Sequence, residues 1–509
     1  NSTDGSYNTA VGYYAMRGNA SSGLTGDGVN VAVGYQAMSG VTTASNCVAI
    51  GGNALDALTT GEANIAIGRE AMTTASSGEN HNIAIGHNSM SDSNNGCNDY
   101  NVAIGSYALK GGTNVISANV AIGYGVMSDV NASSTGGTYN TGIGYNAMNG
   151  TWTTASSNYN TAVGSQSMQG AMNGATDNTA LGYNSLKALT TGDKNTAIGM
   201  RSLESLNTGY QNTALGRTSL QAVTSGHDNI GIGFDCGLFT NEGNHNIFIG
   251  TEAGAQNRTG DELILIGYRA GYALNHDTST DGTVAIGYES LKDLATGGGN
   301  TALGFKSMQN ADGAEAENTC IGFLSGHDMD NDASTRNTYV GIYSGAGGSG
   351  SAVDNTAIGA YAFRLTGSLG GTFNTAVGKS ALGGTWDTAA SNYNTAIGGL
   401  TLDGAMNGAL YNTAVGYAAL SAVTTADNNT GIGTGSGVGI TTGSSNTFLG
   451  FESGYTMTTT GSTVLIGYQA GKAINSADAN GTVAIGYQSG LSITDGQQNT
   501  FVGYQAGEQ

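Results

Sequence analysis

The sequence predicts an all-β fold, a parallel β-roll or β-helix solenoid of about 28 coils of 17–22 residues each. Three observations predict it. A phrase of Asn, Thr or an aliphatic residue, a small residue, an aliphatic residue and Gly recurs throughout. The glycines of successive phrases lie 17 to 22 residues apart, and the composition, with 86 glycines, no proline and 10% charged residues, keeps the same character along the chain. Self-similarity at such a period is the signature of a stack in which one repeat forms one coil.

The slots of the repeat have distinct preferences. We number the Asn of each phrase slot zero and the Gly slot four, so that "NTALGYNSL" runs from Asn178 at slot zero to Leu186 at slot eight. Slot three is Ile, Val or Leu in every copy, and slot eight is mostly Leu or Met, otherwise Gly, with one Phe at Phe363. Asn occupies slot zero in 23 of the 28 copies, which predicts a ladder of side-chain amides that bond from coil to coil.

The strand and loop segments follow from the same slots. Slots zero to four favour a short strand that ends at a glycine. A repeat of 17 residues has room for two strands of about five residues and two bends. The variable length falls between slot eight and the next Asn, in tracts such as "NHDTSTDG" (275–282) and "GGTWDTAAS" (383–391), which we expect to be solvent loops.

An internal duplication supports one continuous repeat array over residues 1–509. Residues from about 140 to 290 resemble residues from about 374 to 490, and the later copy has lost two whole 17-residue units. A solenoid tolerates such a loss, because each unit contacts only its neighbours.

Slots two and eight vary together. Slot two is Ala or Gly in most copies and another apolar residue in seven: Phe248, Leu265, Cys320, Tyr339, Phe448, Leu465 and Phe501. Slot eight is Gly in the same seven copies: Gly254, Gly271, Gly326, Gly345, Gly454, Gly471 and Gly507. A close-packed interior accepts added volume only where volume is removed nearby, so the two slots are predicted to share one packed space.

The alternation of strand side chains also bears on oligomeric state. Slots two and three point to opposite faces of a strand, and we expect slot three to be core. Slot two then needs cover of its own, which other chains in a closed homotrimer would supply. The alternative is that the roll folds its second face inward.

Charge and hydropathy exclude some partners. The formal charge of −21 comes from 36 acidic and 15 basic residues, which argues against nucleic acid or an anionic membrane surface as a partner. No apolar run approaches the roughly eighteen residues of a membrane span, so no membrane insertion is expected in this segment. The first residues, "NSTDGSYNTAVG", lack signal-peptide features and already follow the repeat, so we expect a processed chain or a piece of a longer protein.

The sequence contains no convincing catalytic constellation, and no enzymatic activity is expected. Gly378, Lys379 and Ser380 match the end of a phosphate-binding loop, but the earlier glycine of that loop is replaced by Phe373. The histidines are scattered and are interpreted as loop residues: His81, His87, His227, His245, His276 and His327.

The cysteines show no metal-ligand spacing and no paired framework. They are Cys47, Cys97, Cys236 and Cys320. Cys236 occupies slot seven and Cys320 slot two, so both are predicted to be small packed residues.

The best metal candidate is an acidic tract. Asp328, Asp330 and Asp332 place three carboxylates at alternate positions, as oxygen-ligand calcium loops do. The glycine expected sixth is Ala333 and the glutamate expected twelfth is Tyr339, so a solvated acidic loop is the alternative. No other cofactor is expected.

Aromatic residues follow the glycine in about half of the copies, as at Tyr268, Tyr288 and Tyr487. Stacking of these rings from coil to coil is favoured over a sugar-binding stripe.

Two protein families share the motif. "NVAIG" (101–105 and 119–123) and "TVAIG" (283–287 and 482–486) resemble the head repeats of YadA-type trimeric autotransporter adhesins, although the coil is longer here. "NTFVGYQAG" (499–507) is similar to repeats in bacteriophage tail fibres. The resemblance implies left-handed parallel β-rolls assembled as homotrimers.

We therefore expect a non-catalytic fibrous structural protein on a virion or outside a cell, the shaft or adhesive rod of a bacteriophage tail fibre. A bacterial trimeric surface adhesin and a self-assembling extracellular filament are the alternatives. The expected partners are other copies of the chain and a cell-surface glycan or receptor. An ice-binding solenoid fits less well, because Val or Ile replaces Thr at slot one in 12 of the 28 coils. An acyltransferase β-helix also fits less well, because only a third of each coil follows its hexapeptide rule, as at Ile485–Gly490.

Overall fold

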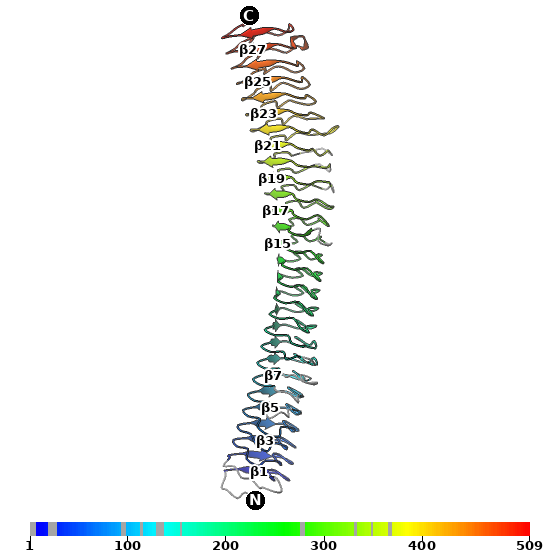
Figure 1. Cartoon of the computed structure of the whole chain (residues 1–509), viewed down its shortest axis with the longest axis vertical. Coiled ribbons are helices and arrows are strands. Elements are labelled where there is room, and N and C mark those ends of the chain that lie inside the picture. Colours follow the sequence, from blue (N-terminus) through cyan, green and yellow to red (C-terminus); the bar gives the residue numbers. More distant parts are fainter. Residues whose placement is uncertain are drawn as a thin grey trace. The chain divides into compact units, whose positions relative to one another are not determined.

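A computed structural model of the chain confirms the parallel β-solenoid (Figure 1). The residues that the structure describes are 7–18, 28–92, 98–111, 116–128, 137–152, 155–274, 280–329, 333–347, 350–364 and 369–508. The chain divides into two compact units, Asn1–Ile249 and Gly250–Gln509, and each unit is a stack of the same kind of coil.

Each coil contributes one three-residue strand at slots one to three. The strands of the first unit are β1 (Thr9–Val11), β2 (Val31–Val33), β3 (Val48–Ile50), β4 (Ile65–Ile67), β5 (Ile83–Ile85), β6 (Val102–Ile104), β7 (Val120–Ile122), β8 (Thr141–Ile143), β9 (Thr161–Val163), β10 (Thr179–Leu181), β11 (Thr196–Ile198), β12 (Thr213–Leu215), β13 (Ile230–Ile232) and β14 (Ile247–Ile249).

The strands of the second unit are β15 (Ile264–Ile266), β16 (Val284–Ile286), β17 (Thr301–Leu303), β18 (Thr319–Ile321), β19 (Thr338–Val340), β20 (Thr356–Ile358), β21 (Thr375–Val377), β22 (Thr395–Ile397), β23 (Thr413–Val415), β24 (Thr430–Ile432), β25 (Thr447–Leu449), β26 (Val464–Ile466), β27 (Val483–Ile485) and β28 (Thr500–Val502). A short 3-10 helix, η2 (Ala477–Ala479), lies between β26 and β27. Within each unit, every strand pairs in parallel with the next, slot against slot.

The prediction of two strands of about five residues in each coil is wrong. In the coil of β11, the strand is followed by a turn in which Arg201 at slot six and Leu203 at slot eight have φ of 59° and 48°. Left-handed residues cannot continue an extended strand. The turn still stacks on its neighbours, because the Arg201 N–H donates to the Tyr183 carbonyl at 2.8 Å and the Leu203 N–H to the Ser219 carbonyl at 3.1 Å.

The glycine at slot four makes the close stacking possible. Gly216 has φ of 145°, which side chains disfavour, and a Cβ there would lie 2.2 Å from the carbonyl oxygen of Gly233 in the next coil. The same dense coil-to-coil bonding of backbone N–H groups explains the absence of proline, which has no N–H to donate.

The predicted asparagine ladder is confirmed. Asn212 is fully buried, and its Nδ2 donates to Asn195 Oδ1 at 3.1 Å and to the Gly226 carbonyl at 2.8 Å. Its Oδ1 accepts the backbone N–H of Asn229 at 3.1 Å and the Asn229 amide at 3.0 Å. One side chain thus satisfies buried polar groups on both neighbouring coils.

The core of each coil lies between slots two and eight, and the prediction that they share one packed space is confirmed. Tyr339 at slot two is buried, and a Cβ at Gly345 in slot eight would lie 2.2 Å from its ring. A Cβ at Gly471 would lie 2.7 Å from Leu465 in the same way. Large side chains therefore fit at slot two only where slot eight has none.

The prediction that slot three is core is wrong. Slots one and three lie on the outer face of the sheet; Leu181 and Ile397, both at slot three, are 47% and 42% exposed. Strand alternation permits either face to be inside, and the coil closes over slot two because slot eight packs there. The chain covers slot two itself, which is the alternative of a roll that folds its second face inward.

We expect Gly216→Ala to lower the free energy of unfolding by about 3 kcal/mol or more, because the backbone conformation and the approach of Gly233 both oppose a side chain. Urea unfolding followed by circular dichroism measures the change, and hydrogen exchange locates it. Gly52→Ala is the matched control, since a Cβ there meets nothing within 4 Å. That control should leave stability unchanged or raise it by up to about 1 kcal/mol. Equal effects of the two variants would contradict this role of slot four.

A second expectation concerns the ladder. Asn212→Ala should lower the free energy of unfolding by about 2–5 kcal/mol, because the N–H of Asn229 and the carbonyl of Gly226 each lose a buried partner. The control is Asn207→Ala. Asn207 is exposed, and its side-chain oxygen accepts a solvent-exposed hydrogen bond from the Thr190 hydroxyl. Urea midpoints that shift equally for both variants would show that the ladder adds no stability.

Candidate functional site

The outer face of the sheet in each unit carries an unbroken row of partly exposed aliphatic side chains. Slot three is Ile, Val or Leu in every described coil, and none of these side chains is buried. Slot one, on the same face, is Thr, Val or Ile, again never buried. We call these two rows the outer ladders. In soluble proteins, contiguous exposed apolar surface is typical of interaction sites.

A row of exposed aromatic rings lies at slot five, directly after the glycine. In the second unit, Tyr268, Tyr288 and Phe305 stack at centroid distances of 5.2 and 5.3 Å, and Tyr468, Tyr487 and Tyr504 stack at 5.2 and 5.1 Å. The prediction of coil-to-coil stacking is confirmed. Each of these rings packs against a neighbouring ring and stays partly exposed.

The first unit also contains a small recess of about 370 Å³ near β7 and β8. Its lining residues are Tyr107, Lys110, Tyr124, Gly125, Ser128, Tyr145, Asn146 and Asn149. Among the described residues that line the recess, there is no histidine or carboxylate that could activate the Ser128 hydroxyl.

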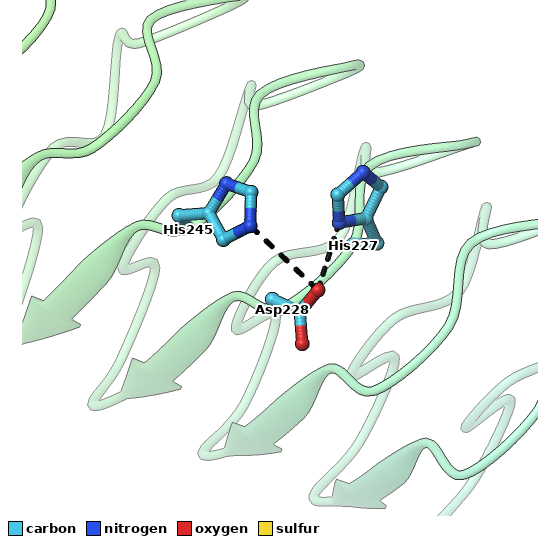
Figure 2. A group of neighbouring side chains, drawn as sticks. All are labelled: His227, Asp228 and His245. Carbon is cyan, nitrogen blue, oxygen red and sulfur yellow. Dashed lines mark hydrogen bonds and ion pairs between the residues drawn. The ribbon is translucent and has the colours of Figure 1, made fainter.

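A cluster of three ligand-type side chains lies where the chain returns towards β13 and β14 (Figure 2). His227 and Asp228 come directly before slot zero of one coil, and His245 precedes slot zero of the next. The Nδ1 of His227 lies 2.9 Å from Asp228 Oδ2, and the Nε2 of His245 lies 3.9 Å from the same oxygen. We call these residues the His-Asp-His cluster.

The backbone holds the cluster in place. Asp228 and His245 occupy equivalent positions one coil apart, and both have φ of 56°. The His245 N–H donates to the His227 carbonyl at 3.1 Å, and the Asp228 N–H donates to the Tyr210 carbonyl at 3.1 Å. The His227 N–H donates to Asn244 Oδ1 at 3.0 Å. Tyr210 also stacks on the His227 ring, with centroids 4.6 Å apart.

Of the predicted calcium candidate, the structure places Asp328 alone; Asp330 and Asp332 lie outside the described residues. The Asp328 carboxylate accepts bonds from His327 Nδ1 at 2.6 Å and from Asn310 Nδ2 at 3.0 Å. The bond from His327 lowers the pKa of Asp328 below its usual value. Calcium binding at this tract stays a prediction.

Cys47, Cys236 and Cys320 are buried free thiols. The prediction that Cys236 and Cys320 are small packed residues is therefore confirmed. Cys97 lies outside the described residues. Burial raises the pKa of Cys236 to about 11 and also raises the pKa values of Cys47 and Cys320. Buried thiols of this kind are poor nucleophiles.

The remaining residues considered in the sequence analysis do not form a site with one another in the part of the chain that the structure describes. Lys379 of the phosphate-loop match is exposed and follows strand β21 in an ordinary turn. His276 lies outside the described residues, and His81 stacks on Tyr100 at 5.1 Å. The interpretation of every histidine as a plain loop residue missed the His-Asp-His cluster. Its signal was the separation of Asp228 and His245 by 17 residues, one full coil.

No family model matches the chain, and the comparison with curated proteins finds no match either. Among the described residues, no helix has the length and apolar character needed to cross a membrane.

We expect the three buried thiols to resist a thiol-specific disulfide reagent in the native chain. At pH 8 only about 0.1% of Cys236 would be thiolate, given its raised pKa, and burial blocks the reagent. A Cys97→Ser variant, with and without denaturant, restricts the measurement to these thiols. Rapid labelling of the native variant would contradict their burial.

Proposed function

We propose that the chain is a non-catalytic fibrous structural protein whose stacked coils form the shaft or adhesive rod of a larger assembly. The observation that carries this proposal is the pair of outer ladders. Each coil adds one partly exposed aliphatic side chain to the slot-three row. Such a row is unfavourable in contact with water, and lateral packing against other rods would bury it.

Other copies of the same chain fit this surface best, and we propose a homotrimer of left-handed coils. Identical chains share the spacing of their ladders, so aligned copies match coil for coil, and three around one axis form a closed assembly. Slots one and three carry no charged residue in any coil, although the whole chain has a formal charge of −21. Chains of like charge can therefore meet at this face without placing charges opposite each other.

The setting of the rod rests on the motif resemblance. We propose a bacteriophage tail fibre displayed on the virion, with a bacterial surface adhesin or an extracellular filament as alternatives. The uniform coil supports a mechanical role in all three, because repeated coils add length while each depends only on its neighbours.

The test is the native mass of the whole chain by light scattering after size exclusion. We expect three chains for the native protein and a smaller assembly for Ile397→Glu, which places a charge in the slot-three row. Ala405→Glu, an exposed position in the loop of the same coil, is the matched control and should leave the mass unchanged. A native mass of one chain would contradict the proposal.

A further inference from the structure

We propose that the His-Asp-His cluster binds a divalent transition-metal ion of the Zn²⁺ type and links two neighbouring coils through it. Two imidazole nitrogens and one carboxylate oxygen are a donor set that zinc accepts in proteins, with the fourth position open to water. No other group of three such ligands is found in the part of the chain that the structure describes.

The distances suit a single ion. The ligand atoms of His227, Asp228 and His245 all lie within 4.8 Å of one another. Donors about 2.0–2.1 Å from a tetrahedral zinc ion are about 3.3 Å apart. The separations of 2.9 and 3.9 Å from Asp228 Oδ2 bracket that value, so small side-chain rotations would bring all three donors to one ion.

Hydrogen bonding alone does not account for the arrangement. His227 Nδ1 and Asp228 Oδ2 form a hydrogen bond, but His245 Nε2 at 3.9 Å is too far from the same oxygen for a second one. Figure 2 shows both rings directed at this one oxygen. An ion between them would satisfy all three groups.

Binding an ion at this site would cost little conformational entropy, because the backbone that carries the ligands is already ordered. The Asp228 N–H donates to the Tyr210 carbonyl of the preceding coil, and the His245 N–H donates to the His227 carbonyl, so backbone hydrogen bonds fix both positions. The ring of Tyr210 stacks on His227 and limits its rotation. The side chains of His227, Asp228 and His245 are 28%, 34% and 57% exposed, so an ion can enter from solvent. The negative charge of the chain favours the approach of cations.

A bound ion would join residues of two successive coils at their exposed edge. Separating these coils would then require loss of a ligand as well as of hydrogen bonds. The inferred role is a local brace of the stack, without a catalytic step.

Isothermal titration calorimetry of the whole chain with Zn²⁺ tests the proposal. We expect one ion per chain for the native protein and an affinity lower by roughly 100-fold or more in His245→Asn and Asp228→Asn, since each loses a direct ligand. Asn already occupies the position of His245 in other coils, as Asn46 and Asn428, so the fold should be retained. His81→Asn, at the same position of a distant coil, is the control and should bind as the native chain does.

Two further readouts separate this site from adventitious binding. Co²⁺ in place of Zn²⁺ should give the visible absorption of a tetrahedral site in the native chain and in His81→Asn, but not in His245→Asn. Zn²⁺ should also slow hydrogen exchange in the segment 226–246 of the native chain. No heat with excess Zn²⁺, or unchanged affinity in both ligand variants, would overturn the proposal.

Discussion

The close approach of successive coils at slot four is the constraint on which the rest of each unit depends. A glycine there, with φ near 135° and the next coil's carbonyl where a Cβ would be, sets the coil separation. Only at that separation can strands pair slot against slot and turns exchange backbone hydrogen bonds. A side chain at slot four would push neighbouring coils apart and break several bonds together, which explains why the glycine recurs in every copy.

The asparagine ladder is the second consequence of this stacking. In each unit, the amide at slot zero reaches the equivalent amide only because the register never shifts. Where Thr463 replaces asparagine, its hydroxyl still donates to Asn446 Oδ1 at 2.7 Å, so a shorter polar side chain preserves part of the pattern. The left-handed residues at slots six and eight are unfavourable individually, and the coil-to-coil bonds of the same turns offset that cost.

In-register stacking also determines what the surface can do. Whatever occupies an outward slot is repeated as a row, so a single preference for an aliphatic residue at slot three becomes an apolar ladder, and a preference for tyrosine at slot five becomes a stack of rings. The same rule turns residues separated by one repeat, such as Asp228 and His245, into spatial neighbours. The proposed assembly face and the proposed metal site therefore lie at different positions of the coil.

The sequence by itself determined the repeat, the parallel solenoid, the amide ladder and the exchange of volume between slots two and eight, because each depends on residue types at a fixed spacing. The tertiary structure alone decided which apolar slot lies inside. Slots two and three are both apolar and alternate across the strand, so the pattern permits either choice, and only the path of the turn shows slot eight packed on slot two. It also decided that His227, Asp228 and His245 meet. The 17-residue spacing places Asp228 and His245 one coil apart, but it does not say which way their side chains turn. The backbone conformation and the coil-to-coil hydrogen bonds of this segment direct them and His227 toward one another.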